Sequence, residues 1–305
     1  MKAFKFLSNT AFVFSLVVLA SCSSDNDIEE TKTVAKKIEF KAIINSNDTE
    51  DTEASSKVTR ATLEDDYTVS WDDNDGIAVF CDNNEEAVGF GITPSSVDGS
   101  TATFTNYGEV LPFWFDPNGF YYALYPNTSA ATLNIGYASI TSVLPTNQTV
   151  SSGRTYDKKA LFMAACADKD ERIFNFKNIP ALIKVTISNN GDGKVKFIEI
   201  ESKNSANILS GNFEVAPDYY NRVTIRPVSG ADKKHTVKLQ IPESADAQDF
   251  YLAVLPGRFD GLTLKFESAS GVVAKHEGNK AVEFKRSKIY DFGSYDIEKE
   301  IPEVK

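Results

Sequence analysis

The sequence predicts an all-β protein, most simply two β-sandwich domains in tandem. Apolar and polar residues alternate with period two in nearly every patterned segment, as in a half-buried strand. Gly, Asn, Asp and Pro lie in several of the intervals between these segments, where they favour turns. No long segment carries the 3.6-residue apolar repeat of an amphipathic helix. The chain has 305 residues, long for one compact core, so two domains are the default expectation.

The N-terminal segment, MKAFKFLSNTAFVFSLVVLASC, has the features of a secretory signal. Two lysines precede an apolar run that is too short to remain as a membrane-spanning helix. Its end, LASC, resembles a bacterial lipobox, in which the chain is cut before the cysteine and the new N-terminus is acylated. We therefore expect residues 1–21 to be a lipoprotein signal peptide and Cys22 to be lipidated. The alternative is cleavage by the ordinary signal peptidase, with Cys22 left as a free thiol.

Residues 22–33 follow as an acidic tether, which continues from the cysteine as SSDNDIEE. This acidic run resembles the signal that directs Bacteroidetes lipoproteins to the outer face of the outer membrane. Each buried methylene of an acyl chain contributes about 0.8 kcal/mol, and several chains make the attachment lasting. We expect an outer membrane lipoprotein exposed at the cell surface.

The first predicted strand is KKIEFKAII, residues 36–44. Its apolar side chains alternate with charged ones, so they share one face. The four apolar side chains on that face are Ile38, Phe40, Ala42 and Ile44. The strand is followed by NSNDTEDTEASSK, residues 45–57, which is polar and free of Pro and therefore suits protease access.

A single arginine, Arg60 in VTRAT, stands in the most acidic part of the chain. From Asn45 to Gly76 there are ten acidic residues and two basic ones, Lys57 and Arg60. The arginine has three interpretations: an ordinary surface residue, a member of an ion pair, or a place where the chain is cut. Its position after an apolar strand and an accessible loop favours the third.

The later segments repeat the strand pattern, and a charge-rich stretch divides them. ACADKDERIF, residues 165–174, interrupts apolar runs on both sides and is the best candidate for a domain boundary. We expect an N-terminal domain over 34–170 and a C-terminal domain with a tail over 171–305. The segments with strand alternation are TATFTN, KVKFIEIES, NRVTIRPV, HTVKLQIP, LTLKFES and AVEFKRSKIYDF.

Composition and motifs argue against several functions. The net charge is -11, and no Lys/Arg cluster could neutralise a run of phosphates, which argues against nucleic acid as a partner. The two histidines, His235 and His276, belong to no H-x-x-x-H, H-x-H or C-x-x-C arrangement. G-x-S-x-G, P-loop and G-x-G-x-x-G motifs are absent. We expect no enzyme activity, no cofactor and no metal site.

Two short features have structural interpretations that compete with chemical ones. Cys81 and Cys166 each end an apolar run, so two buried thiols are favoured over a disulfide, which export would permit. WDDNDGI, residues 71–77, fails the register of a calcium loop, because Trp71 would occupy the first ligand position. An Asp/Asn/Gly turn explains this stretch better than adventitious calcium.

The aromatic stretch from Phe113 to Tyr125 also has two interpretations. Exposed rings such as Trp114 could stack on sugars, which would indicate a glycan-binding surface protein. The apolar density around Tyr122 and Leu124 instead favours a buried strand.

Several segments together resemble the Bacteroidetes fimbrillin family (FimA/Mfa-like pilins and adhesins) in content and order, over residues 1–292. They are the lipobox, KKIEFKAII, TRAT, SWDDNDGIAVF, YYALYP, LPTNQTV, FNFKNIPALIKVTI, FYLAVLPG and FKRSKIYDF. The sequence departs from the family in DNDGI, where a Gly-Asp pair is expected before the strand. It departs again in FKNIPAL, where Asn178 replaces a His found in many relatives and Pro180 indicates a strand edge or bulge.

The resemblance implies two transthyretin-like β-sandwich domains and assembly into a pilus by strand exchange. An Arg-specific surface protease would cut between Arg60 and Ala61, which removes the lipid anchor and the first strand, residues 36–44. Another subunit would then donate a strand to the empty groove. The candidate donor is the C-terminal tail GSYDIEKEIPEVK, with Tyr295, Ile297 and Ile301 at even spacing. A stalk or tip subunit, or an adhesin that does not polymerise, all remain open, with a host or bacterial receptor or glycan as a further partner.

Overall fold

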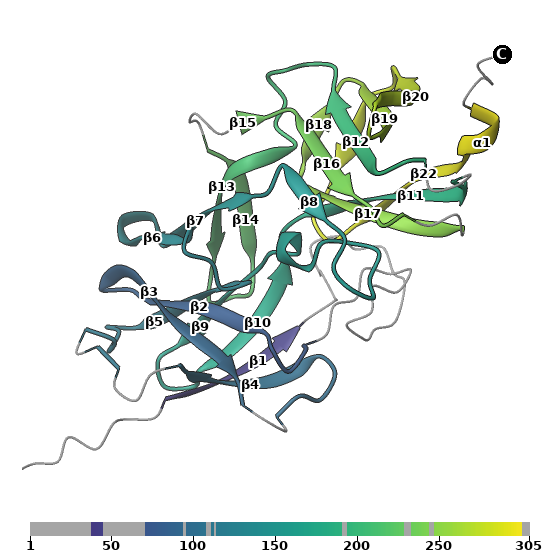
Figure 1. Ribbon diagram of the computed structural model, residues 1–305. Coiled ribbons are helices and arrows are strands. Elements are labelled where there is room, and N and C mark those ends of the chain that lie inside the picture. Colours follow the sequence, from purple (N-terminus) through teal and green to yellow (C-terminus); the bar gives the residue numbers. More distant parts are fainter. Residues whose placement is uncertain are drawn as a thin grey trace, which may run out of the picture. The chain divides into compact units, whose positions relative to one another are not determined.

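The computed structural model describes residues 38–44, 71–93, 96–107, 111–112, 114–190, 194–228, 233–243 and 247–300. They belong to one compact unit and form strands almost throughout (Figure 1). Helical structure in the described residues is limited to two 3-10 turns, η1 (Ile135–Tyr137) and η2 (Lys158–Ala160), and to α1 (Ile297–Glu300). The prediction of an all-β protein is confirmed.

A closed barrel forms the first half of the described fold. Its strands follow the order β1-β10-β9-β5-β2-β3-β4. β1 lies between β4 and β10 (Figure 1), antiparallel to the former and parallel to the latter. The strand bounds are β1 Glu39–Ile44, β2 Gly76–Cys81, β3 Asn84–Ile92, β4 Thr101–Asn106, β5 Phe120–Tyr125, β9 Met163–Asp168 and β10 Ile173–Asn178.

The remaining described strands form open sheets. One has the order β17-β11-β22, a second β20-β19-β12-β16-β8, a third β14-β13-β7-β6 with β15 on β13, and a fourth pairs β18 with β21. Their bounds are β6 Thr132–Asn134, β7 Ser139–Leu144, β8 Asn147–Thr149, β11 Ala181–Asn189, β12 Phe197–Ser202, β13 Ser210–Pro217, β14 Val223–Pro227, β15 Lys233–Lys234, β16 Thr236–Gln240, β17 Gln248–Val254, β18 Gly257–Phe259, β19 Leu262–Ser268, β20 Gly271–Gly278, β21 Val282–Phe284 and β22 Ile289–Asp296.

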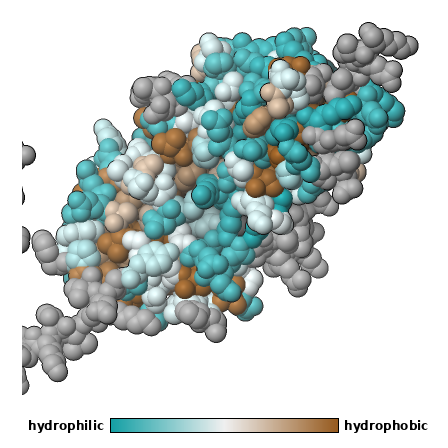
Figure 2. Space-filling view, in the orientation of Figure 1, coloured by the Kyte–Doolittle hydropathy of each residue, from teal (hydrophilic) through white to brown (hydrophobic). Residues whose placement is uncertain are grey.

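Two apolar clusters form the core: β1 and β12 bury alternate residues, whereas β2, β5 and β9 are buried along almost their whole length. One cluster lies in the barrel and extends to Phe213 and Val215 of β13. The other lies among the open sheets, where alternate residues of β12, Ile198 and Ile200, are fully buried. On the face in view, hydrophobic residues form small groups among hydrophilic ones (Figure 2).

The predicted division near residue 170 and the transthyretin-like character of the domains stay predictions. β10 begins beyond that division and is part of the barrel sheet. β7 and β8 precede it and pair with β13 and β16. Among the described residues, no helix is both long and apolar enough to cross a membrane.

Cys81 and Cys166 are buried free thiols, as predicted. Cys81 lies in β2 and Cys166 in β9. Burial, followed by the neighbouring carboxylates, raises the pKa of each thiol to about 12. Both therefore stay protonated at neutral pH.

We expect neither thiol to react with iodoacetamide in the native protein at about pH 8, because the thiolate is the nucleophile. The test uses protein lacking Cys22, with mass spectrometry of alkylated peptides and guanidinium-unfolded protein as the control for full reaction. Because the folded pKa lies above the ordinary 9.0, the stability contributed by the neutral thiols is lost as pH rises from about 9 to about 12. Rapid alkylation of native Cys81 would contradict this assignment.

Gln148 in β8 connects two sheets through a buried side chain. Its Nε2 donates to the carbonyl of Ala253 in β17 at 2.7 Å, and its Oε1 accepts from the Ala253 amide at 3.0 Å. The residue is 1% exposed, so these bonds satisfy backbone groups that water does not reach.

Replacing Gln148→Leu should lower the free energy of unfolding by about 2–4 kcal/mol, because two backbone groups would be left without partners at roughly 1–3 kcal/mol each. The exposed neighbour Asn147 offers a control, since Asn147→Ala should change it by less than about 0.5 kcal/mol. Urea denaturation measures both, and equal stabilities would refute the role of the amide.

Candidate functional site

β1 carries the row of apolar side chains predicted for it. Ile38 just precedes the strand at 2% exposed, Phe40 and Ala42 are fully buried, and Ile44 is 6% exposed. Glu39 and Lys41 between them are exposed. The shared face assigned to these four residues from their spacing is therefore observed.

Backbone pairing holds β1 on both of its edges. Phe40 lies opposite Phe104 of β4, and Ala42 lies opposite Phe174 of β10. Beyond the strand pairs, Lys41 N donates to the Arg172 carbonyl at 3.1 Å and Ile44 N to the Ser100 carbonyl at 2.8 Å. The N-terminal strand is thus an interior strand of the barrel whose partners lie far away in the sequence.

The ring of Phe40 is the centre of the groove that holds β1. It lies 5.0 Å from the Phe90 ring, 4.9 Å from Tyr121 and 4.9 Å from Phe174, measured between ring centroids. Burial of each large side chain of this row contributes roughly 1.5–3 kcal/mol. Removing the strand would expose an aromatic groove and two unpaired strand edges, on β4 and β10.

Trp71, the next described residue after Ile44, anchors the chain to the core. It is 3% exposed, and its Nε1 donates to the Ser100 carbonyl at 3.1 Å, the group that also accepts from Ile44. Its ring packs against Phe104, Tyr125 and Phe176. The chain is therefore held on each side of residues 45–70, by the strand pairing of β1 and by the ring contacts of Trp71, and the two sides share the Ser100 carbonyl.

The predicted lipidation and processing sites lie outside the described residues. This applies to Cys22, Arg60 and Ala61, and to Ile301 of the tail. Their roles stay predictions.

The described part of the predicted donor tail packs on the protein itself. Tyr295 is the penultimate residue of β22, and its ring lies 5.0 Å from Phe266 and 4.7 Å from His276. Ile297 is fully buried in the second core cluster. These residues would have to leave that cluster to act as a donor strand, a role that stays a prediction.

The stretch WDDNDGI forms a turn before β2, as predicted. Asp75 N donates to the Asp72 carbonyl at 2.9 Å, and both carboxylates pair with cations of the 151–160 segment, Arg154 and Lys158. Within the described residues no group of three or more His, Cys, Asp or Glu side chains could hold a metal ion.

The aromatic stretch considered for sugar stacking is mostly core. Phe115, Tyr121, Tyr122 and Tyr125 are between 2% and 7% exposed. Trp114 is half-buried and packs against the first core cluster. Among the described residues of this stretch there is no open row of rings, and its interpretation as a buried strand is the one that fits.

Comparison with known proteins gives structural matches. No protein-family model and no curated protein matches the sequence. A "putative cell adhesion protein" from Bacteroides ovatus matches with a TM-score of 0.46 at 15% identity, covering 86% of this chain and 93% of that one.

Two further structures are similar. One from Bacteroides uniformis, described in the same words, has a TM-score of 0.44 at 15% identity, with 85% and 94% covered. The tip fimbrial protein Mfa3 from Porphyromonas gingivalis, truncated at its C-terminus, matches with a TM-score of 0.32 at 9% identity. The match covers 79% of this chain and 81% of that one. These matches are described as adhesion and fimbrial proteins, not as enzymes.

Replacing Phe40→Ala should lower the free energy of unfolding by about 3–5 kcal/mol, because it leaves a cavity among three aromatic rings. Glu39→Ala alters an exposed neighbour on the same strand and should change the free energy of unfolding by less than about 0.5 kcal/mol. Thermal and urea denaturation provide the comparison. Similar values for the two variants would mean that β1 is not held through this row.

Proposed function

We propose that this chain is a fimbrillin-like pilus subunit or surface adhesin, exported as a lipoprotein and assembled by protease-triggered strand exchange after Arg60. The observation that carries the proposal is β1, an N-terminal strand that closes the barrel with a buried apolar row. The sequence resemblance supplies the processing scheme, with two transthyretin-like domains and an outer membrane lipoprotein that becomes part of a fimbrium.

The contacts of β1 suit a strand that is cut free and later replaced. Cleavage between Arg60 and Ala61 would break the covalent link while Trp71 and the groove still hold the two flanks. Because release of β1 removes its buried row from the core, it would be slow. The emptied groove would expose strand edges on β4 and β10, which are templates for β-strand addition.

The groove also specifies the incoming strand. Four inward positions at period two must be apolar, and the position of Phe40 favours an aromatic ring because three rings surround it. Partners in this scheme are an Arg-specific surface protease, other pilin subunits, and a host or bacterial receptor or glycan. A surface-anchored glycan-binding lipoprotein that does not polymerise is the second candidate, favoured by a pocket that the exposed Tyr107 lines together with Asn127 and Thr128.

Treatment of protein lacking residues 1–22 with an Arg-specific protease should produce one discrete cut after Arg60, followed by oligomers in size-exclusion chromatography. Arg60→Gln should stay intact and monomeric, while Lys57→Gln should behave as the wild type. A peptide of residues 36–44 should suppress the oligomers, and the same peptide with Phe40→Asp should not.

Persistent monomer after complete cutting would overturn polymerisation and leave the second candidate. The N-terminus of protein recovered from the cell surface separates the two outcomes independently. An acylated Cys22 indicates a standing lipoprotein, and Ala61 indicates a processed subunit.

A further inference from the structure

Tyr107 is an exposed ring that packs against glycines. The residue follows β4 and is 67% exposed. Its backbone amide donates to the Gly89 carbonyl at 3.2 Å. A Cβ built on Gly91 would lie 2.4 Å from the Tyr107 Cε1, and one on Gly76 would lie 2.4 Å from the Tyr107 hydroxyl. A Cβ on Gly89 would lie 3.0 Å from the Tyr107 Cδ2. The ring occupies the space that three side chains would otherwise fill.

These glycines are costly for the strands that contain them. Gly76 and Gly91 lie directly opposite each other across β2 and β3, and Gly89 is two residues along. Gly in a strand interior costs roughly 0.5–1 kcal/mol relative to Ala and often marks a place of close approach. Their effect here is to hold a tyrosine ring flat on the barrel, so that little side-chain entropy remains to be lost on binding.

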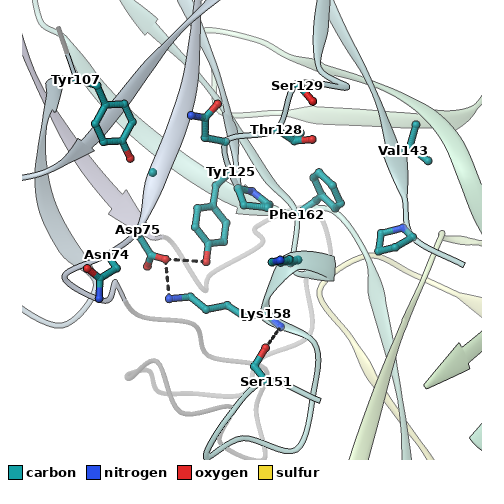
Figure 3. A pocket seen from close by; sticks show the side chains of 15 residues that line it. Asn74, Asp75, Tyr107, Tyr125, Thr128, Ser129, Val143, Ser151, Lys158 and Phe162 are labelled. Atoms are coloured by element: carbon teal, nitrogen blue, oxygen red, sulfur yellow. Dashed lines mark hydrogen bonds and ion pairs between the residues drawn. The ribbon is translucent and has the colours of Figure 1, made fainter. Parts of the chain in front are cut away.

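A hollow of about 820 Å³ opens beside this ring (Figure 3). Tyr107 and Val143 lie on opposite sides of it in that view, with Tyr125 and Phe162 between them. Amide and hydroxyl groups complete the lining, contributed by Asn74, Asn127, Thr128, Ser129 and Ser151. The hollow thus combines one open aromatic face with neutral hydrogen-bonding groups.

Ion pairs fix one wall of the hollow. Asp75 Oδ1 accepts from the Tyr125 hydroxyl at 3.0 Å and lies 2.6 Å from Lys158 Nζ, as Figure 3 shows. Asp75 is 5% exposed, and Asp72 pairs with Lys158 and Arg154. These two carboxylates and two cations balance one another. Burial, together with Asp75, raises the pKa of Tyr125, which keeps its hydroxyl a donor.

Lys159 adds a positive charge to the lining, and the buried carboxylate of Asp157 in the same turn accepts from its backbone amide at 2.9 Å. Its side chain is exposed and lines the hollow. Within the described part of the chain it forms no ion pair. Of the two lysines that line the hollow, Lys158 pairs with Asp75, so Lys159 is the cation that an anionic ligand would meet.

We propose that this hollow binds an acidic saccharide, with one apolar face of a sugar ring on Tyr107, its hydroxyl groups on the amide and hydroxyl lining, and its carboxylate on Lys159. A sugar ring fits because it presents C–H groups on its faces and hydroxyl groups at its edge, which matches a flat ring surrounded by polar groups. Aromatic side chains supply contact area at low entropic cost, and the contacts with the three glycines fix the Tyr107 ring before a ligand binds. The site is independent of strand exchange, because neither Arg60 nor the buried row of β1 lines it.

Titration calorimetry of the full-length chain in detergent, with galacturonic acid, N-acetylneuraminic acid and galactose as probes, tests the proposal. At least one acidic sugar should bind, and more tightly than galactose. Tyr107→Ala should weaken that binding at least tenfold, while Tyr107→Phe keeps the ring and should retain it within about twofold. Lys159→Ala should lower the affinity for the acidic sugar to that for galactose, and the affinity for galactose should stay unchanged.

Glycine variants give a second readout that leaves Tyr107 in place. Gly91→Ala should reduce binding as Tyr107→Ala does, because the added Cβ displaces the ring. Gly278→Ala is the matched control, since a Cβ on that strand glycine meets only the Leu262 carbonyl at 3.5 Å. Tyr220→Ala removes another exposed tyrosine, 77% exposed, and should have no effect. The proposal is overturned if no probe binds, or if a folded Tyr107→Ala protein, checked by circular dichroism, binds as the wild type does.

Discussion

Closure of the barrel by β1 is the constraint on which the first half of the molecule depends. β4 and β10 meet through this strand, and the ring of Phe40 fills the space among Phe90, Tyr121 and Phe174. The rings surrounding Phe40 come from β3, β5 and β10, so a residue near the N-terminus organises packing between elements distant in sequence. Loss of the strand would therefore affect the whole barrel cluster.

The contacts of β1 are backbone pairing and apolar packing, which are the kinds of contact that the proposed replacement strand would have to make. The contribution of β1 comes from apolar side chains at period two and from backbone pairing, which any chain of the same pattern can reproduce. The covalent continuation is held at Trp71, whose ring packs on Phe104, Tyr125 and Phe176. The period-two pattern and the ring at the position of Phe40 are thus the features of β1 on which the barrel packing depends.

Local patterns predicted the strands well, because alternation is a property of neighbouring residues. TATFTN coincides with β4, and the row from Ile38 to Ile44 is buried as its spacing indicated. The pocket at Tyr107 was not predicted, because its platform depends on the register that places Gly76 opposite Gly91. Glycines at alternate positions, in GFGI, were the available signal, since they interrupt a strand that is otherwise well patterned.

The sequence also could not predict which aromatic rings are buried and which are exposed. A density of rings in the sequence indicated either a sugar surface or a core, and composition alone could not choose between them. Burial decides for Tyr121 and Tyr122, while the exposed ring that does face a hollow, Tyr107, stands apart from that stretch. Exposure depends on which face of a closed barrel a residue occupies, and that is fixed only when all its strands are paired.

β3 connects the groove of β1 with the hollow at Tyr107. Phe90 points inward to the ring of Phe40, while Gly89 and Gly91 on either side of it support Tyr107 on the outer face. Because side chains alternate along a strand, the inward ring of Phe90 and the outward glycine platform lie on opposite faces of β3, so one strand serves the groove and the hollow without a shared side chain.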